Sequence, residues 1–333
     1  MRYFVTGATG FIGGHVARQL AEAGHDVVAL ARSRAKAGGL EAAGLVVATG
    51  DVTDQASMRV PMEGADGVFH LAAWYKVGVR DKSPAWSINV DGTRNVLELA
   101  SELGVPKTVY TSTLAVFSDT RGQIVDESYR HDGPFLSEYE RTKWTAHYEV
   151  AQPMIRKGLP IVVVQPGVTY GPGDEGPMYD LLARYLTGTL PLVPRGTAYC
   201  WGHVEDTARG HVLAMERGRP GESYILAGPP HSLEDALLLA ERLTGIPLPR
   251  RRASPAMMRF LSRLMGLVGR VKDLPEAYDP EGLRVLAGAT YLGTSAKAEH
   301  ELGFRARSLE DGLPEALRDA MDRLGVRPAA RDE

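Results

Sequence analysis

The sequence TGATGFIG, residues 6–13, follows a short apolar run and leads into an amphipathic segment. Its glycines Gly7, Gly10 and Gly13 keep side chains out of a tight turn between a strand and a helix. Backbone N–H groups and the helix N-terminus can then approach a pyrophosphate. The stretch therefore predicts a dinucleotide-binding unit at the start of the chain, with a purely structural turn as the alternative.

Strand-like and helix-like segments alternate through the first half of the chain. Short β-branched or apolar runs suit strands buried on both faces of a parallel sheet. They lie at Arg2–Thr6, Asp26–Ala31, Leu45–Ala48, Gly67–Leu71, Thr108–Thr111 and Ile161–Val164. Helical patterns between them lie at Gly13–Ala23, Gln55–Glu63, Pro84–Leu103 and Leu136–Lys157. The alternation predicts an α/β fold with a Rossmann-type, doubly wound parallel sheet of about seven strands.

The alternation stops after Gln165, where proline and glycine become frequent. We expect a dinucleotide-binding Rossmann domain at residues 1–165, to which residues 204–228 return with a helix at Val204–Met215 and a strand at Ser223–Leu226. Residues 166–203 and 229–330 are expected to form a smaller, mostly helical substrate lobe. Arginines interrupt the apolar stretch Met257–Val271, so it is expected to pack in the lobe or at a dimer contact rather than to enter a membrane.

Composition excludes several functional classes. The chain has 333 residues, 44% hydrophobic and 24% charged, which is the balance of a globular protein with a large core. A formal net charge of −3 provides no basic field for nucleic acid. The single cysteine, Cys200, excludes an internal disulfide framework, and the N-terminal residues do not resemble a signal peptide. We therefore expect a cytoplasmic protein with a small-molecule substrate, no nucleic-acid partner, no bound metal and no membrane span.

A second motif lies roughly 130 residues downstream of the glycine turn, where Tyr139 and Lys143 share one face of a predicted helix. An ammonium beside a tyrosine, together with an oxidised nicotinamide, lowers the phenol pKa from its ordinary value of about 10. The phenol can then exchange a proton with a carbonyl or an alcohol. Y-x-x-x-K occurs by chance in many helices, but Ser112 and Thr113 end the fifth predicted strand, at the edge where α/β sheets bind ligands.

The end of the second predicted strand bears on the choice of cofactor. NAD-specific sites place an acidic residue there, whereas this chain has Ala31 followed by Arg32. A guanidinium can clamp a 2′-phosphate bidentately, so Arg32 favours NADP (NADPH) over NAD, with a solvated surface arginine as the alternative. Asp51, after the third predicted strand, is placed either to accept from the adenine amino group or to cap the next helix.

These motifs together resemble the extended (atypical) short-chain dehydrogenase/reductase superfamily, the NAD-dependent epimerase/dehydratase family. Further landmarks of the resemblance are Asn89–Thr93, Tyr170–Gly173, His203–Asp206 and Lys297–Phe304. The resemblance implies that Thr113 orients the reacting oxygen, that Tyr139 carries the proton and that Lys143 tunes the phenol and reaches the nicotinamide ribose. It also implies a homodimer as an expectation for the family.

The expected site is then assigned residue by residue. The cofactor is expected to contact Gly7, Thr9, Gly10, Phe11, Ile12, Arg32, Asp51, Val52, Leu71, Ala72, Ala73, Ser112, Tyr139, Lys143, Pro166 and Val168. The substrate pocket is expected to include Trp74, Tyr75, Tyr179 and Tyr199, for which packing between the lobes is the alternative.

At three positions the sequence departs from patterns of the superfamily, and these departures indicate which branch the chain resembles. Leu114-Ala115 replace the acidic pair that follows the catalytic hydroxyl in sugar-nucleotide dehydratases. Tyr199 stands where epimerases tend to place a diphosphate-binding arginine, and Gln165 replaces the usual arginine before Pro166. The chain is therefore most similar to NADP-dependent reductases related to dihydroflavonol 4-reductase, cinnamoyl-CoA reductase and hopanoid-associated proteins. The alternatives are an NAD-dependent nucleotide-sugar epimerase or dehydratase, and a non-enzymatic NADP-dependent regulator.

Overall fold

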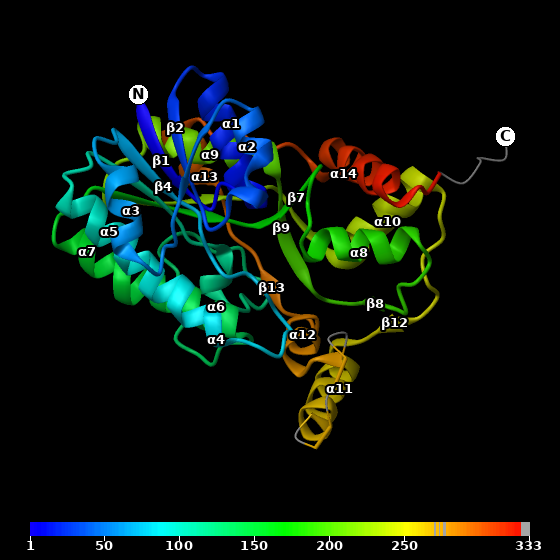
Figure 1. Ribbon diagram of the computed structural model, residues 1–333. Coiled ribbons are helices and arrows are strands. Elements are labelled where there is room, and N and C mark those ends of the chain that lie inside the picture. Colours follow the sequence, from blue (N-terminus) through cyan, green and yellow to red (C-terminus); the bar gives the residue numbers. More distant parts are fainter. Residues whose placement is uncertain (270, 273, 276–277, 328–333) are drawn as a thin grey trace.

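The computed structural model describes residues 1–269, 271–272, 274–275 and 278–327. Seven parallel strands form the central sheet in the order β10-β6-β5-β4-β1-β2-β3 (Figure 1). The strands are β1 Arg2–Thr6, β2 Asp26–Ala31, β3 Val46–Thr49, β4 Gly67–His70, β5 Thr108–Thr111, β6 Ile161–Pro166 and β10 Ser223–Leu226. The predicted doubly wound sheet is confirmed, and the bounds of β1, β2, β5 and β10 agree with the sequence to the residue.

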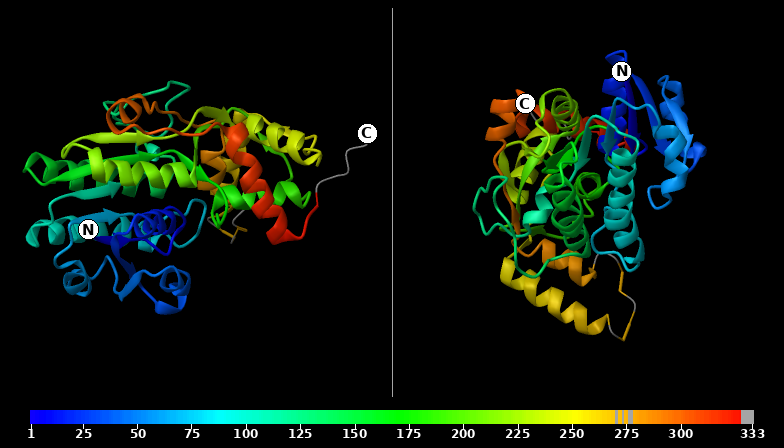
Figure 2. Two further views of the ribbon diagram at one scale, coloured as in Figure 1. Left: turned by 90° about the horizontal axis from the view of Figure 1, so that it is seen from above. Right: turned by 90° about the vertical axis from the view of Figure 1, so that its left-hand side faces the viewer.

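Helices cover both faces of this sheet (Figure 2). One layer contains α1 Phe11–Glu22, α2 Gly38–Ala42, α9 Val204–Arg217 and α13 Ala296–Leu302, with the short turn η1 Arg34–Lys36 before α2. The other contains α3 Gln55–Met62, α5 Gly92–Glu102 and α7 Gln152–Arg156.

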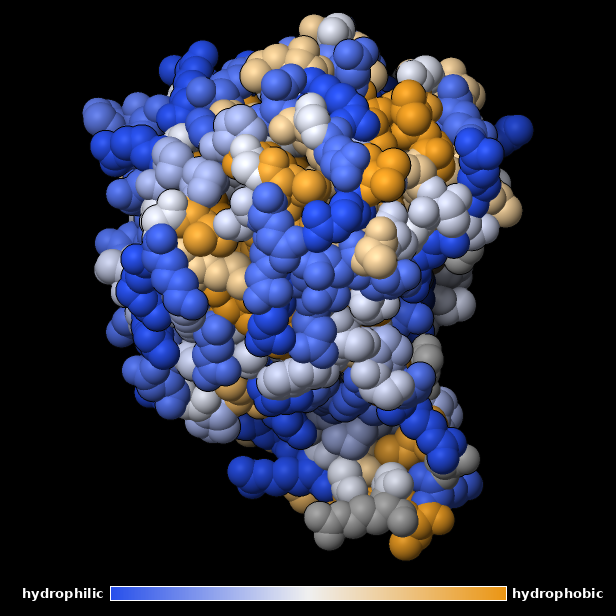
Figure 3. Space-filling view, turned by 60° about the vertical axis from the view of Figure 1, so that its left-hand side comes forward, coloured by the Kyte–Doolittle hydropathy of each residue, from blue (hydrophilic) through white to orange (hydrophobic). Residues whose placement is uncertain are grey.

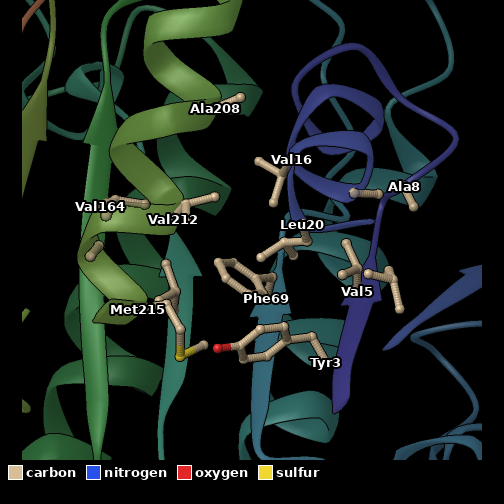
Figure 4. Close-up of a cluster of buried hydrophobic side chains, with 14 of the residues drawn as sticks. Tyr3, Val5, Ala8, Val16, Leu20, Phe69, Val164, Ala208, Val212 and Met215 are labelled. Atoms are coloured by element: carbon tan, nitrogen blue, oxygen red, sulfur yellow. The ribbon is translucent and has the colours of Figure 1, made fainter. Parts of the chain in front are cut away.

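Alternation along each strand divides the core between the two layers. Tyr3 and Val5 of β1 point to the first layer, where Leu20 and Met215 pack on them (Figure 4). The intervening Phe4 packs in the other layer, against Met58 among others. This is the period of two expected for a strand that is buried on both sides.

Two of the predicted long helices are not uniform α-helices. Pro84–Leu103 is observed as α4 Ser83–Trp86, the π-helical segment η2 Ser87–Asp91 and then α5. Leu136–Lys157 is observed as α6 Glu138–Thr145, the π-helical segment η4 Ala146–Ala151 and then α7. π-Helical segments are rare and occur frequently at functional sites. Nothing in the apolar spacing distinguishes them from α-helix.

The remaining elements form a second lobe beside the ends of β6 and β10. Its four-stranded sheet is centred on β9 Ala198–His203, which pairs with β7 Val168–Tyr170, β11 Pro230–Ser232 and β13 Thr290–Tyr291. Helices α8 Pro177–Leu186, α10 Leu233–Thr244 and α14 Leu309–Leu324 enclose its core. A strand pair, β8 Val193–Pro194 and β12 Arg252–Ala253, leads to α11 Pro255–Val268 and α12 Pro280–Val285.

Two glycines hold the lobes together by their backbones. A Cβ on Gly167 would lie 2.3 Å from the Cys200 carbonyl oxygen, and one on Gly228 would lie 2.0 Å from the Trp201 oxygen. The segments that leave β6 and β10 therefore contact β9 main chain to main chain. The division at 165, 203 and 228 stays a prediction, and residues 328–330 of the predicted second lobe lie outside the described residues. Among the described residues, no helix has the length and apolarity needed to cross a bilayer.

Candidate functional site

The β1–α1 turn is shaped by its glycines. Gly7 has φ of +75°, and a Cβ there would lie 2.6 Å from the Ala72 nitrogen. A Cβ on Gly13 would lie 2.2 Å from the Gly7 carbonyl oxygen, so α1 can approach the turn only because residue 13 has no side chain. Gly10 is the N-cap of α1, and no side chain caps this helix. The exposed, uncapped helix start fits a phosphate group.

The end of β4 lies against this turn. Thr6 Oγ1 is 2.8 Å from His70 Nδ1 and accepts a hydrogen bond of 3.2 Å from the Ala72 N–H. His70 Nε2 lies 3.0 Å from Thr93 Oγ1. Both ring nitrogens are therefore occupied inside the protein, and His70 holds Leu71 and Ala72 beside the glycine turn.

The structure contradicts one of the two interpretations of Asp51, that of a helix cap. Its Oδ1 accepts hydrogen bonds from the Thr53 N–H at 2.9 Å and the Thr53 hydroxyl at 2.8 Å. Asp54 caps α3 by accepting from the Ala56 N–H, so the helix-cap interpretation of Asp51 is wrong. Val52 is buried, and Arg32 is exposed directly after β2. Their contacts with a cofactor stay predictions.

Tyr139 lies in the first turn of α6, which Ser137 caps by accepting from the Glu140 N–H at 3.2 Å. Its phenol lies close enough to the Thr113 side chain for that hydroxyl to affect its pKa. Thr113 Oγ1 also accepts from the Ala115 N–H at 3.1 Å. This places the phenol and the threonine hydroxyl together at the carboxyl end of β5, as the sequence predicts.

Burial raises the pKa of Tyr139 to about 12, although the nearby Thr113 side chain opposes the shift and Glu140 adds to it. We predicted that the ammonium and an oxidised nicotinamide together lower this pKa; among the described residues, desolvation outweighs the stabilising contacts. The phenol is therefore protonated at neutral pH, the state that a proton donor requires.

Lys143 is held by β5. It is 3% exposed, its Nζ donates to the Thr111 carbonyl at 2.7 Å, and the ammonium lies 5.1 Å from the centre of the Tyr110 ring. Burial lowers its pKa to about 7. The ammonium thus lies under the carboxyl end of β5, one helical turn from Tyr139.

Three further residues expected to contact the cofactor, Ser112, Pro166 and Val168, lie at or just beyond the carboxyl ends of β5 and β6. The Ser112 hydroxyl is buried and lies 2.8 Å from His147 Nδ1 in η4. This hydroxyl faces the protein interior, and its expected contact with the cofactor stays a prediction. Pro166 ends β6 and Val168 begins β7, where it pairs with Trp201 of β9.

The four aromatic residues expected in the substrate pocket differ in what they contact. Tyr75 is 49% exposed, and its ring is edge-on to Tyr139 with centroids 5.1 Å apart. Tyr199 stacks on Tyr291 with centroids 5.6 Å apart. Trp74 is buried and exchanges backbone hydrogen bonds with the Asn89 side chain.

Tyr179 packs in the core of the second lobe. The guanidinium carbon of Arg323 lies 3.8 Å from the centre of its ring. For Trp74 and Tyr179 the contacts are those of the packing alternative, whereas Tyr75 borders the proposed proton donor.

A cavity of about 580 Å³ opens beside the N-terminus of α6, and the sequence analysis did not identify it. Residues from three separate segments line it, among them Gly78, Lys82, Ser137, Arg141, Asp279 and Arg284. Lys82 forms an ion pair with Glu281 of α12, and Glu281 Oε1 also accepts from the Glu138 N–H at 3.1 Å. No motif links these segments, because they meet only through the folded lobe.

One group of side chains has metal-ligand geometry. His203, Glu205 and Glu315 have ligand atoms within 4.8 Å of one another. Arg307 already supplies positive charge there, 2.9 Å from Glu205 and 3.5 Å from Glu315. The cluster is explained as an ion-pair network, and the expectation of no bound metal stays a prediction.

Buried histidines predict a pH-dependent stability. Burial lowers the pKa of His70 and His147 to about 3 and that of His211 to about 4, and Lys143 adds to the effect on the first two. Their unfolded pKa is about 6.5. The stability that they contribute is therefore complete above pH 6.5 and is lost as the pH falls below it, by about 1.4 kcal/mol per pH unit for each histidine.

Urea unfolding at about pH 7.5, 6.5 and 5.5 measures this slope, the change in the free energy of unfolding with pH. We expect His211→Gln to reduce it and a change at the exposed His300 to leave it unchanged. The measurements stop at about pH 5.5 because burial raises the pKa of Glu140 and Asp174. Protonation of these two carboxyl groups at lower pH stabilises the folded protein and opposes the effect of the histidines. A free energy of unfolding that is constant between pH 6.5 and 5.5 contradicts the prediction.

Comparison with known proteins agrees with the fold and the motifs. The family model for the NAD dependent epimerase/dehydratase family matches residues 3–227, so the chain belongs to this family. Its members are extended short-chain dehydrogenase/reductase-type enzymes that depend on a nicotinamide dinucleotide.

Curated relatives and solved structures match along nearly the whole chain. A Synechocystis protein provisionally named dihydroflavonol 4-reductase is 32% identical over 95% of this chain and 93% of its own. Sterol demethylase protein B of Methylococcus capsulatus is 28% identical over 95% and 97%. The crystal structure of dTDP-glucose 4,6-dehydratase from Streptomyces venezuelae with NAD bound has a TM-score of 0.77 and 26% identity, and the match covers 98% of both chains.

Proposed function

We propose that the protein is an NADP-dependent reductase that converts a ketone or an aldehyde to an alcohol. The observation that carries the proposal is the proximity of the Tyr139 phenol to the Thr113 side chain at the carboxyl end of β5, where Lys143 is buried and donates to the Thr111 carbonyl. The glycine turn fits a dinucleotide, since α1 begins there with no side-chain cap, and a Cβ on Gly7 or Gly13 would push β4 or α1 away from the turn. When bound there, the nicotinamide supplies the hydride.

The side chains then have separate tasks. Thr113 donates its hydroxyl hydrogen to the carbonyl oxygen of the substrate and fixes that oxygen beside the phenol. Tyr139, protonated because of its raised pKa, gives its proton to the same oxygen as the alcohol forms. Lys143, held by the Thr111 carbonyl, offers its remaining N–H groups to the ribose next to the nicotinamide.

Turnover tests the proposal directly. Purified protein, NADPH and a panel of ketones and aldehydes are followed at the nicotinamide absorbance. Oxidation of NADPH that depends on one of these carbonyl compounds supports a reductase. A protein that binds NADPH but turns over no carbonyl compound in a broad panel supports the regulator instead.

Arg32 is proposed to select NADP over NAD. Its exposed guanidinium follows β2 and can clamp a 2′-phosphate, with each charge-assisted hydrogen bond worth roughly 1.5–3 kcal/mol. We expect Arg32→Ala to weaken NADPH binding by about 10- to 100-fold and to leave NADH binding nearly unchanged. Fluorescence titration of both cofactors measures the ratio.

The matched control for this variant is Arg34→Ala. Arg34 belongs to the same loop, but it lies 3.5 Å from Glu41 and is expected to contribute little to cofactor choice. Wild-type protein that binds NADH as tightly as NADPH, or an unchanged preference in the Arg32 variant, would refute the assignment.

A nucleotide-sugar epimerase or dehydratase is the second candidate, because the dehydratase structure with NAD matches nearly the entire chain. Such an enzyme would use the same three side chains and recycle its cofactor. Leu114-Ala115 provide no acid or base after Thr113, which disfavours water loss. NAD that copurifies with the protein, together with activity in the absence of added NADPH, would favour this candidate.

A further inference from the structure

Helix α11 stands at one end of the molecule, away from the central sheet. Figures 1 and 2 show it in yellow beside α12, with the body of the protein on one side only. Met258, Leu261 and Met265 pack toward Leu283 of α12. This contact confirms that part of the helix packs in the lobe, but it covers only one face.

The opposite surface of α11 and the turn after it is apolar and exposed. The exposed fractions are 46% for Met257, 67% for Phe260, 41% for Leu264, 61% for Leu267 and 87% for Val271. At about 100° per residue the four positions within α11 fall within an arc of roughly 80°, and Val271 follows in the turn after the helix. We call these five residues the α11 apolar stripe. Isolated exposed apolar side chains are normal, but a continuous stripe indicates a binding surface.

Positive charge borders the α11 apolar stripe. Arg259 and Arg263 are exposed on the adjoining arc of the helix, and neither has an acidic partner within the part of the chain that the structure describes. The sequence from Arg250 to Lys272 contains seven basic residues and no Asp or Glu. In Figure 3 the projecting lower end of the molecule carries orange apolar atoms next to blue polar ones.

We propose that α11 binds the surface of an anionic lipid bilayer, with the α11 apolar stripe among the acyl chains and Arg259 and Arg263 at the headgroups. An apolar arc flanked by basic residues and free of acidic ones is the pattern of a helix that lies in the membrane interface. A second copy is a poorer occupant, since two such helices would bring the same positive charges together. The helix binds the interface and does not span the bilayer, in agreement with its length and its arginines.

Vesicle cosedimentation of the full chain tests the proposal and does not depend on the proposed function. The probes are vesicles of phosphatidylcholine with phosphatidylglycerol, and vesicles of phosphatidylcholine alone. We expect binding to the anionic vesicles that weakens as the salt concentration rises, and at least about tenfold weaker binding to the neutral ones.

Two variants and one control locate the binding surface. The double change Phe260→Ser with Leu267→Ser, and the double change Arg259→Glu with Arg263→Glu, are each expected to reduce the partition coefficient at least about tenfold. Val60→Ser removes a side chain that is 73% exposed on α3 and is expected to leave binding unchanged. Circular dichroism and cofactor titration confirm that each variant is folded.

Three results would overturn the proposal. The first is no binding of the wild type to anionic vesicles. The second is binding that both double variants retain. The third is a protein dimer in light scattering that Phe260→Ser with Leu267→Ser dissociates, which would assign the α11 apolar stripe to a second copy.

Discussion

Replacement of Tyr139 by phenylalanine is expected to reduce turnover by roughly 10²- to 10⁴-fold, the usual contribution of a positioned acid. The variant keeps the ring that packs edge-on against Tyr75 and loses only the hydroxyl that lies near the Thr113 side chain. The nicotinamide can still bind, but the oxygen that receives negative charge has no proton donor. Steady-state kinetics with the best carbonyl substrate measure the loss in kcat, and titration should give an affinity for NADPH that changes far less than kcat.

Tyr148→Phe is the matched control for this variant. Tyr148 lies in η4, which continues the helix that carries Tyr139. Its change to phenylalanine also removes one hydroxyl, which donates a hydrogen bond of 3.2 Å to the Tyr129 carbonyl. We expect less than a twofold change in kcat there. A loss below about tenfold in Tyr139→Phe, or an equal loss in the two variants, would remove Tyr139 from the proposed chemistry.

Gly13→Ala is expected to destabilise the protein by about 1–3 kcal/mol and to weaken dinucleotide binding more than tenfold. Alanine in place of glycine inside a helix ordinarily stabilises by about 1 kcal/mol. Here the new Cβ would lie 2.2 Å from the Gly7 oxygen and 2.7 Å from the Gly7 carbonyl carbon, both backbone atoms. Helix α1 or the turn must therefore move, and the phosphate cradle moves with it.

Urea unfolding and cofactor titration measure the two effects. Gly266→Ala is the control, because Gly266 lies inside α11 and its nearest foreign atom would be 3.9 Å from the new Cβ, on Pro280. We expect that change to be neutral or stabilising. If Gly13→Ala stabilises the protein as Gly266→Ala does, α1 and the turn do not approach as closely as described.

The sheet could be predicted from the sequence because its strands are short apolar runs separated by amphipathic helices. Such strands are buried on both faces, so nearly all of their residues are apolar and the ends of each run are easy to recognise, as for β1 and β5. The proximity of Tyr139 and Thr113 was also predictable, since a motif fixes each residue on its element and the parallel sheet brings the elements to one edge.

Features that depend on tertiary contacts could not be predicted. The pKa of Tyr139 depends on how deeply the folded chain buries its ring, and no motif indicates that depth. Tyr179 and Tyr75 both look like pocket residues in the sequence, but only the fold places Arg323 over one and Tyr139 beside the other. Residues around Gly78 and Asp279 share a cavity without sharing any motif.

The main-chain contacts of Gly167 and Gly228 with β9 have a mechanical consequence. A hinge between two lobes needs side chains that can slide past one another or a linker that can bend, whereas here carbonyl oxygens leave no room for even a methyl group. We therefore expect the two lobes to move as one rigid unit. Larger movements would then be confined to peripheral segments such as residues 78–82 and α12, which border the 580 Å³ cavity.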